Sequence, residues 1–245
     1  MALTQPLNRY IDHTLLKTTA MDVAYESLLD EAIKYDFRAV CVSPYIAVPI
    51  VRAMKPYPNT KVCTVVSFPH GNVPLLFKLR EAEYFIDNGV QEIDWVLNYI
   101  EVYNDKWHNV TMEMGQMASL CREAGVVSKC IVETGALIAP ALLERVFRCV
   151  QDTGVDFIKT STGYVGDGAK VEHIKLWNSL RNGEPSPLIK ASGGIKTAER
   201  ALAMIDAGAD RLGTSASVEI MEQYAALSNP TTNREGAPKE VSGEC

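Results

Sequence analysis

The chain has 245 residues, of which 47% are hydrophobic and 22% charged, and its formal net charge is −6. This length allows one large core, and the negative charge without any basic run argues against nucleic-acid binding. No apolar run reaches the ~18 residues of a membrane span, and the first ten residues lack a signal-peptide pattern. Six scattered cysteines without a CxxC pair indicate reduced thiols. We expect a cytoplasmic globular protein with no nucleic-acid or membrane partner.

A repeated pattern runs along the chain: an amphipathic stretch, a turn that often contains glycine, and a short apolar run. Examples are EAIKYDFRAVCVS, REAGVVSKCIVET and VQDTGVDFIKTST. The apolar runs do not alternate clearly with polar residues, which is typical of parallel strands covered on both faces. Gly89, Gly125, Gly154 and Gly208 stand where a helix would end in a left-handed residue.

Eight strand-like runs alternate with eight helix-like stretches. The strands are expected at 10–12, 39–42, 62–66, 92–96, 128–132, 157–159, 188–190 and 211–213. The helices are expected at 22–35, 46–54, 75–88, 104–124, 140–152, 170–180, 197–207 and 218–227. This count predicts an α/β protein with a (β/α)8 TIM-barrel fold, as a single domain over residues 1–227. A doubly wound open sheet is the alternative, but no GxGxxG follows the first strand.

The composition changes at Ser228. Residues 228–245 contain two prolines, two glycines and several charges, and Val241 is their only bulky apolar residue. Such a segment cannot bury enough apolar surface to offset the entropy of ordering it. We expect a flexible C-terminal tail, with a tail folded back over the barrel mouth as the alternative.

Charged residues gather where the active site of a TIM barrel lies, at the carboxyl ends of the strands. Lys159 and Lys190 each follow an apolar run directly, in FIKTSTG and LIKASGG, where an ammonium group is costly to bury. Asp94 shares one strand face with Glu92 and is expected to point into the barrel. Each lysine alone also fits a surface residue whose ammonium reaches solvent, and Asp94 alone also fits a structural ion pair.

The two lysines are more informative as a pair than singly. Neighbouring strands lie ~5 Å apart, so the two ammonium groups would repel by about 2.5 kcal/mol at an effective dielectric of ~20. This repulsion favours a neutral amine on one lysine, which can attack a carbonyl, while the other stays charged. Repulsion of this size is insufficient by itself, so burial among the apolar flanking residues must add to it.

Two glycine turns follow the seventh and eighth strands, in the loops where TIM barrels commonly bind phosphate on backbone N–H groups. Each turn alone also fits a helix cap without a ligand, but together they predict a phosphorylated substrate. The phosphate-binding candidates are Thr162, Gly163, Gly193, Gly194, Gly213 and Ser215. The four histidines are dispersed, with no HxH or HExxH pattern, so we expect neither a metal nor a cofactor.

These motifs resemble those of the deoxyribose-phosphate aldolase family. The similar stretches are YIDHTLLK, VCVSPY, EIDWV, IVETG, FIKTSTG, IKASGGIKTAERAL and AGADRLGTSAS, in family order from about residue 9 to residue 220. The resemblance implies a class I aldolase that interconverts 2-deoxy-D-ribose 5-phosphate with D-glyceraldehyde 3-phosphate and acetaldehyde. It implies that Lys159 forms the Schiff base, that Lys190 is its charged neighbour and that Asp94 transfers protons. It also places Asp12 near Lys190.

Two stretches depart from the family pattern: SFPHG, where members often have GFPLG, and VLNYIEVYNDKWHNV, whose aromatic residues stand near a rim or an interface. The family resemblance implies a homodimer. Two other functions remain open, namely another lysine-dependent phosphosugar aldolase or lyase and a non-catalytic phosphosugar-binding barrel. A binding protein would have no need for two desolvated lysines beside an aspartate, which argues against the last.

Overall fold

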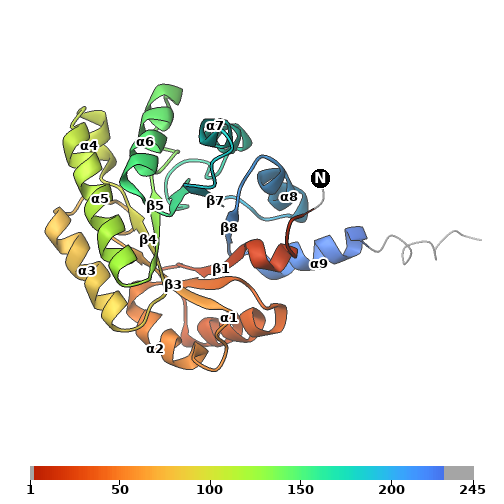
Figure 1. Ribbon diagram of the computed structural model, residues 1–245. Helices are drawn as coiled ribbons and strands as arrows, with labels where there is room; N and C mark the ends of the chain where they lie inside the picture. The colour runs from red at the N-terminus through yellow and green to blue at the C-terminus, as the bar shows by residue number, and fades with distance from the viewer. Residues whose placement is uncertain (1–2, 229–245) are drawn as a thin grey trace, which may run out of the picture.

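The computed structural model describes residues 3–228, which form eight parallel strands surrounded by helices (Figure 1). The strands are β1 Ile11–Leu15, β2 Ala39–Val42, β3 Lys61–Val66, β4 Glu92–Val96, β5 Val127–Ile131, β6 Phe157–Lys159, β7 Leu188–Ser192 and β8 Arg211–Thr214. The helices are the 3₁₀ helix η1 Leu7–Tyr10, then α1 Asp22–Tyr35, α2 Pro44–Met54, α3 Leu75–Asp87, α4 Tyr99–Tyr103, α5 Trp107–Glu123, α6 Pro140–Thr153, α7 Val171–Arg181, α8 Ala198–Asp206 and α9 Ser217–Ser228.

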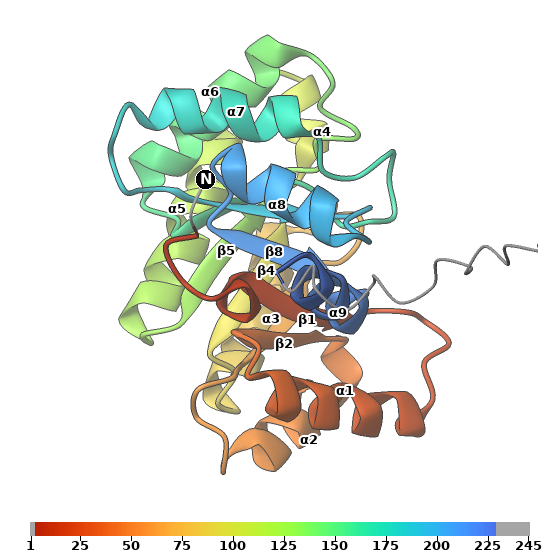
Figure 2. The ribbon, with the colours of Figure 1, turned by 90° about the vertical axis from the view of Figure 1, so that its right-hand side faces the viewer.

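The sheet is a closed barrel whose strands are neighbours in chain order. β1 closes the ring by pairing in parallel with β8, where Ile11 stands opposite Leu212 and Asp12 opposite Gly213. Closure confirms the predicted (β/α)8 barrel and rules out the open sheet. Figure 2 shows α8 and α9 beside the strands that close the ring.

Local signals explain most element boundaries. α2 begins with Pro44, whose fixed φ and missing N–H suit the first turn of a helix. Gly154 ends α6 with a φ of 73°, in the left-handed conformation that glycine adopts without strain. Thr197 caps α8 by accepting a hydrogen bond from the Arg200 N–H at 3.2 Å.

Every predicted boundary lies within three residues of the observed one, but many are shifted by one to three residues. The helix expected at 104–124 is α5, which begins only at Trp107, and the sequence did not predict α4 at Tyr99–Tyr103. Asp105, with a left-handed φ of 54°, lies between these two helices. The first strand begins at Ile11 rather than residue 10, after η1. Of the tail expected from residue 228, Ser228 is the last residue of α9, and residues 229–245 lie outside the described part of the chain.

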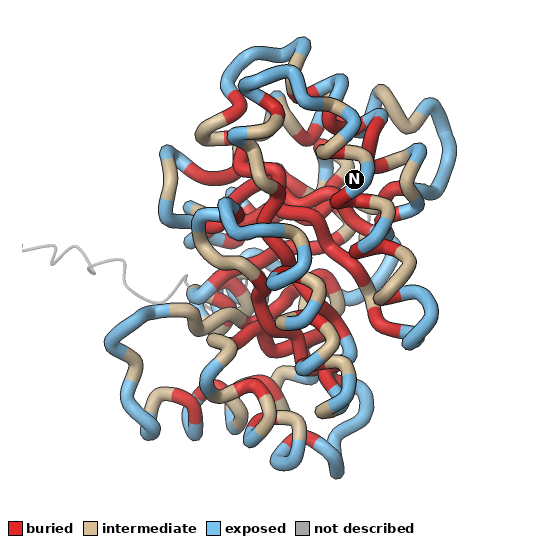
Figure 3. The backbone as a smooth tube through the Cα atoms, turned by 90° about the vertical axis from the view of Figure 1, so that its left-hand side faces the viewer, coloured by how far each residue is buried: buried red, intermediate tan, exposed pale blue. Residues whose placement is uncertain are grey.

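The apolar core lies between the strands and the helices, not inside the barrel. Figure 3 shows the buried chain running through the central strands, with exposed segments at the periphery. Ile93 and Trp95 point outward from β4 into this core, and the Trp95 indole N–H donates to Ser128 Oγ at 3.0 Å. The opposite face of β4 therefore turns Glu92 and Asp94 into the barrel, as predicted. Within residues 3–228, no helix is both long and apolar enough to cross a membrane.

Candidate active site

Lys159 and Lys190 lie side by side on β6 and β7, paired in the sheet register. Lys159 Nζ is 2.7 Å from Asp94 Oδ2, and Lys190 Nζ is 2.8 Å from the same oxygen. The three residues are between 0% and 3% exposed. The structure thus brings together the two lysines and the aspartate selected from the sequence, and one carboxylate oxygen joins them.

A third lysine, Lys129 on β5, belongs to the same cluster and was missed in the sequence analysis. Its Nζ is 2.8 Å from Asp94 Oδ1 and 2.6 Å from Glu92 Oε2, and its side chain is fully buried. The sequence does contain a pattern that indicates Lys129, because this lysine interrupts the buried run VSKCIV much as Lys159 and Lys190 follow apolar runs.

Asp12 and Arg211 complete the cluster on the other side of the barrel. Asp12 Oδ2 contacts Lys190 Nζ, as the placement of Asp12 near the second lysine anticipated, and Asp12 Oδ1 accepts a hydrogen bond from Arg211 at 2.6 Å. Arg211 also lies 3.2 Å from Glu92 Oε2. Arg211 is the first residue of β8, and a basic residue at the start of a strand does not by itself predict a buried ion pair. Its partners become apparent only in the closed barrel.

The cluster contains four cations and three carboxylates, so one positive charge is in excess when all are ionised. The cations are Lys129, Lys159, Lys190 and Arg211, and the carboxylates are Asp12, Glu92 and Asp94. An uncompensated charge in a buried site is costly.

The surroundings perturb the carboxyl groups strongly. Burial alone would raise the pKa of Asp94, but the three lysine ammonium groups around it outweigh burial and hold the pKa well below its ordinary value. Burial likewise opposes ionisation of Asp12, and the charges of Arg211 and Lys190 outweigh it and lower the pKa of Asp12. Both carboxyl groups are accordingly anionic at neutral pH.

The pKa values of two buried lysines are shifted upward. Burial would lower the pKa of Lys190, but the charges of Asp12 and Asp94 outweigh it and raise the pKa above the ordinary value. Burial would also lower the pKa of Lys129, and Asp94 and Glu92 contribute to a net rise. These two lysines are therefore held as ammonium ions.

The glycine loops after β6 and β7 lie close to one another at the mouth. A Cβ on Gly193, whose φ is 85°, would come within 2.9 Å of Gly168 Cα and 3.6 Å of Gly163 Cα. Gly213 lies within β8 and not in the loop after it, and a Cβ on Gly213 would lie 3.1 Å from Lys190 Cε, so this part of β8 faces the lysine cluster. Gly194 follows Gly193 with a φ of 72°, and Ser215 is exposed after β8.

Thr162 differs from the other phosphate candidates because its two donors already have a partner. Its N–H and its hydroxyl donate to Glu133 Oε2 at 3.1 and 2.5 Å. Glu133 lies two residues beyond the end of β5 and has a left-handed φ of 54°. Its Oε1 is buried without a hydrogen-bond partner among the described residues. Burial raises the pKa of Glu133 despite its bonds to Thr162. Glu133 is thus a rim residue whose strained backbone suits a functional position.

The loop after β6 extends across the mouth of the barrel. The Tyr164 hydroxyl donates to Leu16 O at 2.8 Å, beyond the end of β1. The Tyr164 ring meets Phe68, in the SFPHG segment after β3, edge to face at 5.4 Å. Tyr164 therefore connects three loops that lie far apart in the sequence.

Cys41, Cys63 and Asp94 place their ligand atoms within 4.8 Å of one another. Cys63 Sγ lies 3.1 Å from Asp94 Oδ1, and this oxygen also accepts from Lys129. A divalent cation here would stand beside several ammonium groups, which opposes its binding electrostatically. We therefore interpret the thiols as packing and hydrogen-bonding groups beneath Asp94.

Comparison with known proteins shows the family of the chain. The family described as DeoC/LacD family aldolase matches residues 8–219. The chain is 38% identical to the deoxyribose-phosphate aldolase of Finegoldia magna, covering 88% of this chain and 99% of that protein. It is 38% identical to that of Lactococcus lactis subsp. lactis, covering 91% and 99%. The solved deoxyribose phosphate aldolase of Aeropyrum pernix, a tetramer, superposes with a TM-score of 0.82 at 31% identity over 90% of this chain and 92% of that one. The chain belongs to the DeoC/LacD aldolase family.

Proposed function

We propose that this protein is a class I deoxyribose-phosphate aldolase. It cleaves 2-deoxy-D-ribose 5-phosphate to D-glyceraldehyde 3-phosphate and acetaldehyde, and forms it in reverse, through a Schiff base on Lys159. The observation that carries the proposal is Lys159 Nζ at the carboxyl end of β6, hydrogen-bonded at 2.7 Å to Asp94 beside Lys190. The relatives of the chain that bear the same name support the choice of substrate.

Lys159 is the lysine that we assign as the nucleophile. It contacts one carboxylate, whereas Lys129 and Lys190 each contact two. Its side chain is also 4% exposed, while the other two are fully buried. Deprotonation of Lys159 thus removes the excess charge while breaking the fewest ion pairs, and it leaves a neutral amine that can attack a carbonyl.

The neutral amine adds to the C1 aldehyde of the open-chain sugar and forms a carbinolamine. Loss of water gives an iminium, into which the electrons of the C2–C3 bond flow when the C3 hydroxyl loses its proton. Glyceraldehyde 3-phosphate leaves, and protonation of the resulting enamine followed by hydrolysis releases acetaldehyde. Asp94 lies within hydrogen-bond reach of Lys159 Nζ, so we assign it the proton transfers at the carbinolamine.

Lys190 acts as the charged neighbour of Lys159. Its raised pKa and its contact with Asp94 support this role, since the ammonium disfavours a second positive charge beside it. Asp12 keeps Lys190 in place from the opposite side. We assign phosphate binding to the backbone of Gly163, Gly193, Gly194 and Gly213 with Ser215, and we assign Thr162 to the same rim through its bonds to Glu133.

Trapping of the Schiff base tests the proposal. Acetaldehyde and borohydride should ethylate one lysine rapidly, and peptide mass spectrometry should place the ethyl group on Lys159. Lys159→Ala should abolish both the adduct and turnover, while Lys175→Ala, which changes an exposed lysine on α7, should keep both. An adduct on Lys129 or Lys190 instead would refute the assignment.

Substrate comparison separates the remaining alternatives. Cleavage of deoxyribose 5-phosphate well above that of other phosphosugars would exclude a related aldolase of different specificity, and any turnover would exclude a non-catalytic barrel. The homodimer, the cytoplasmic location and the domain limits at residues 1–227 stay predictions. Gel filtration with light scattering would determine the assembly.

A further inference from the structure

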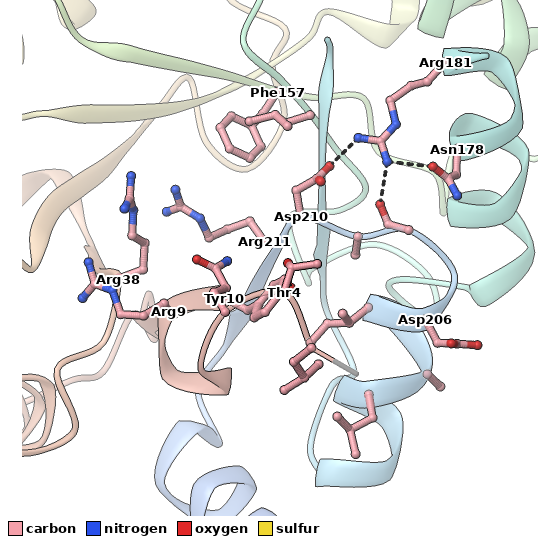
Figure 4. A pocket seen from close by; sticks show the side chains of 18 residues that line it. Thr4, Arg9, Tyr10, Arg38, Phe157, Asn178, Arg181, Asp206, Asp210 and Arg211 are labelled. Carbon is pink, nitrogen blue, oxygen red and sulfur yellow. Dashed lines mark hydrogen bonds and ion pairs between the residues drawn. The ribbon is translucent and has the colours of Figure 1, made fainter. Parts of the chain in front are cut away.

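A second cavity, of about 950 Å³, lies at the amino-terminal ends of the strands, opposite the aldolase mouth (Figure 4). The first residues of β6, β7 and β8, Phe157, Leu188 and Arg211, form part of its wall. The segment 3–5, η1 and the C-terminal ends of α7 and α8 complete it. This volume is in the usual range for small-molecule sites.

Four arginines line the cavity, and two of them donate several hydrogen bonds each. Arg9 donates to the carbonyl oxygens of Asp36, Phe37 and Asn59 at 2.9 to 3.2 Å. Arg181 donates to Asp210 Oδ2 at 2.7 Å and to two oxygens of the loop and helix beside it. These two side chains are therefore fixed parts of the wall.

Arg38 differs, because its guanidinium has no hydrogen bond or ion pair with any residue in 3–228, and its Nε is buried without a partner. Its backbone is held firmly: the N–H donates to Ile11 O at 3.1 Å, and the carbonyl accepts from Lys61 N at 3.0 Å. Arg211, the fourth arginine, uses only NH1 for its described partners Asp12 and Glu92. A buried guanidinium nitrogen without an acceptor is costly, and a bound anion would satisfy it.

The acidic residues of the cavity do not neutralise Arg38. Asp210 is occupied by Arg181 and by the N–H of Ile189 at 2.8 Å. Figure 4 shows Asp206 on the opposite side of the cavity from Arg9, Arg38 and Arg211. The remaining wall is mixed: Leu3, Leu188, Leu202 and Ile205 form an apolar part, and Thr4, Gln5 and Asn178 are polar.

We propose that this cavity binds a phosphomonoester with an apolar or aromatic body. The phosphate pairs with the Arg38 guanidinium beside Arg211, in the two-pronged geometry that arginine offers to phosphate oxygens. The apolar body lies against the leucine-rich part of the wall. The ligand reaches the protein from the face opposite the catalytic mouth, and Arg211 separates it from Asp12 and Glu92 of the lysine cluster.

Calorimetry with phenyl phosphate tests the site on the whole protein. Wild type should bind it, and Arg38→Gln should weaken binding at least about tenfold, the loss typical of one charged hydrogen-bonding contact. Arg52→Gln, which changes an exposed arginine on α2 outside this cavity, should bind as wild type does. Both variants should keep normal turnover, which shows that they are folded and that binding at the catalytic mouth is intact.

Two further probes define the ligand class. Inorganic phosphate should bind more weakly than phenyl phosphate, because it cannot use the apolar wall, and benzyl alcohol should not bind, because it lacks the charge. Equal affinity of wild type and Arg38→Gln for phenyl phosphate would overturn the site. Equal affinity of wild type for phenyl phosphate and inorganic phosphate would overturn the ligand class.

Discussion

Asp94 is the residue on which the site depends most, because its two oxygens contact three lysines and one cysteine. A single carboxylate thereby keeps Lys129, Lys190 and the proposed nucleophile Lys159 within a few ångströms of one another. The arrangement explains how a barrel interior can hold so many lysines. Each added cation lowers the cost of ionising Asp94, and Asp94 lowers the cost of each buried cation.

Lys129 is expected to be needed for both stability and turnover. Lys129→Met keeps the length of the side chain but leaves Glu92 and Asp94 without their shared cation, which should cost about 3–5 kcal/mol of unfolding free energy. kcat should fall at least about tenfold, since Asp94 would then pair more strongly with Lys159. Urea unfolding and steady-state kinetics measure both effects. Lys175→Met on the surface is the matched control, and a variant with unchanged kcat would refute the role.

Acid stability should follow the two buried aspartates. Their pKa values are lower in the folded protein than the ordinary 3.8. Their stabilising contribution is therefore complete above about pH 4 and is lost as the pH falls further toward the folded values. Lys190 has the opposite effect on stability. Its pKa is raised in the folded protein, so its stabilising contribution is complete below its ordinary pKa of 10.5 and is lost as the pH rises above that value. Urea unfolding across this range should show a plateau that falls at both ends, and greater stability on acidification below pH 4 would contradict it.

The loops after β6 and β7 act as one unit at the scale of elements. Gly168 approaches Gly193 so closely that an added Cβ would lie 2.4 Å from Gly193 O, and Ala169 N donates to that oxygen at 3.1 Å. Tyr164 extends the same unit across the mouth to the end of β1. The glycines proposed to bind phosphate are consequently positioned by contacts between loops and not by their own turns alone.

Gly168→Ala should weaken phosphate binding. The methyl group would force Gly193 away, so we expect KM for deoxyribose 5-phosphate to rise at least about tenfold, with cleavage of unphosphorylated deoxyribose nearly unchanged. Gly183→Ala provides a matched control, because Gly183 has a similar φ of 88° but no atom within 4 Å of the added Cβ. Both variants place an alanine at a positive φ and so have similar backbone strain. Only Gly168→Ala also brings the added methyl group into Gly193. Equal KM values in the two variants would argue against phosphate binding by this loop.

At the scale of the whole molecule, a charged network replaces the usual apolar filling of the barrel. It joins β1, β4, β5, β6, β7 and β8 through ion pairs among residues that are at most 5% exposed. The apolar interior of the barrel is correspondingly small, with Cys41, Cys63 and Val65 as its buried cluster. The helices bury the main core on the outside, so the barrel can afford a polar interior for chemistry.

A double-mutant cycle tests whether the network acts as a unit. Glu92→Gln and Lys129→Met remove two partners that lie 2.6 Å apart, so their effects on unfolding free energy should not add. A coupling energy of about 0.5–3 kcal/mol is expected for such contacts. Additive effects would mean that the ion pairs are independent. Glu92→Gln with Lys175→Met should be additive and serves as the control.

Much of this protein was determined by the sequence itself. The repeated strand–helix pattern predicted the closed barrel, since eight apolar runs covered by amphipathic helices have few other ways to bury both faces. The position of Lys159 and Lys190 after apolar runs predicted their adjacency, because parallel strands bring their carboxyl ends to one edge. These predictions depend only on short stretches of the sequence or on the number of strands.

Only the tertiary structure decided which charges meet. Lys129 interrupts an apolar run and Arg211 starts a strand, but neither pattern identifies a partner, and the partners Glu92, Asp94 and Asp12 lie 35 to 199 positions away in the chain. Barrel closure, which sets β8 beside β1, brings Arg211 to Asp12. The break between α4 and α5 likewise depends on one left-handed aspartate that composition does not signal. Long-range electrostatics and single backbone angles have no periodic pattern, so they emerge only when the chain is folded.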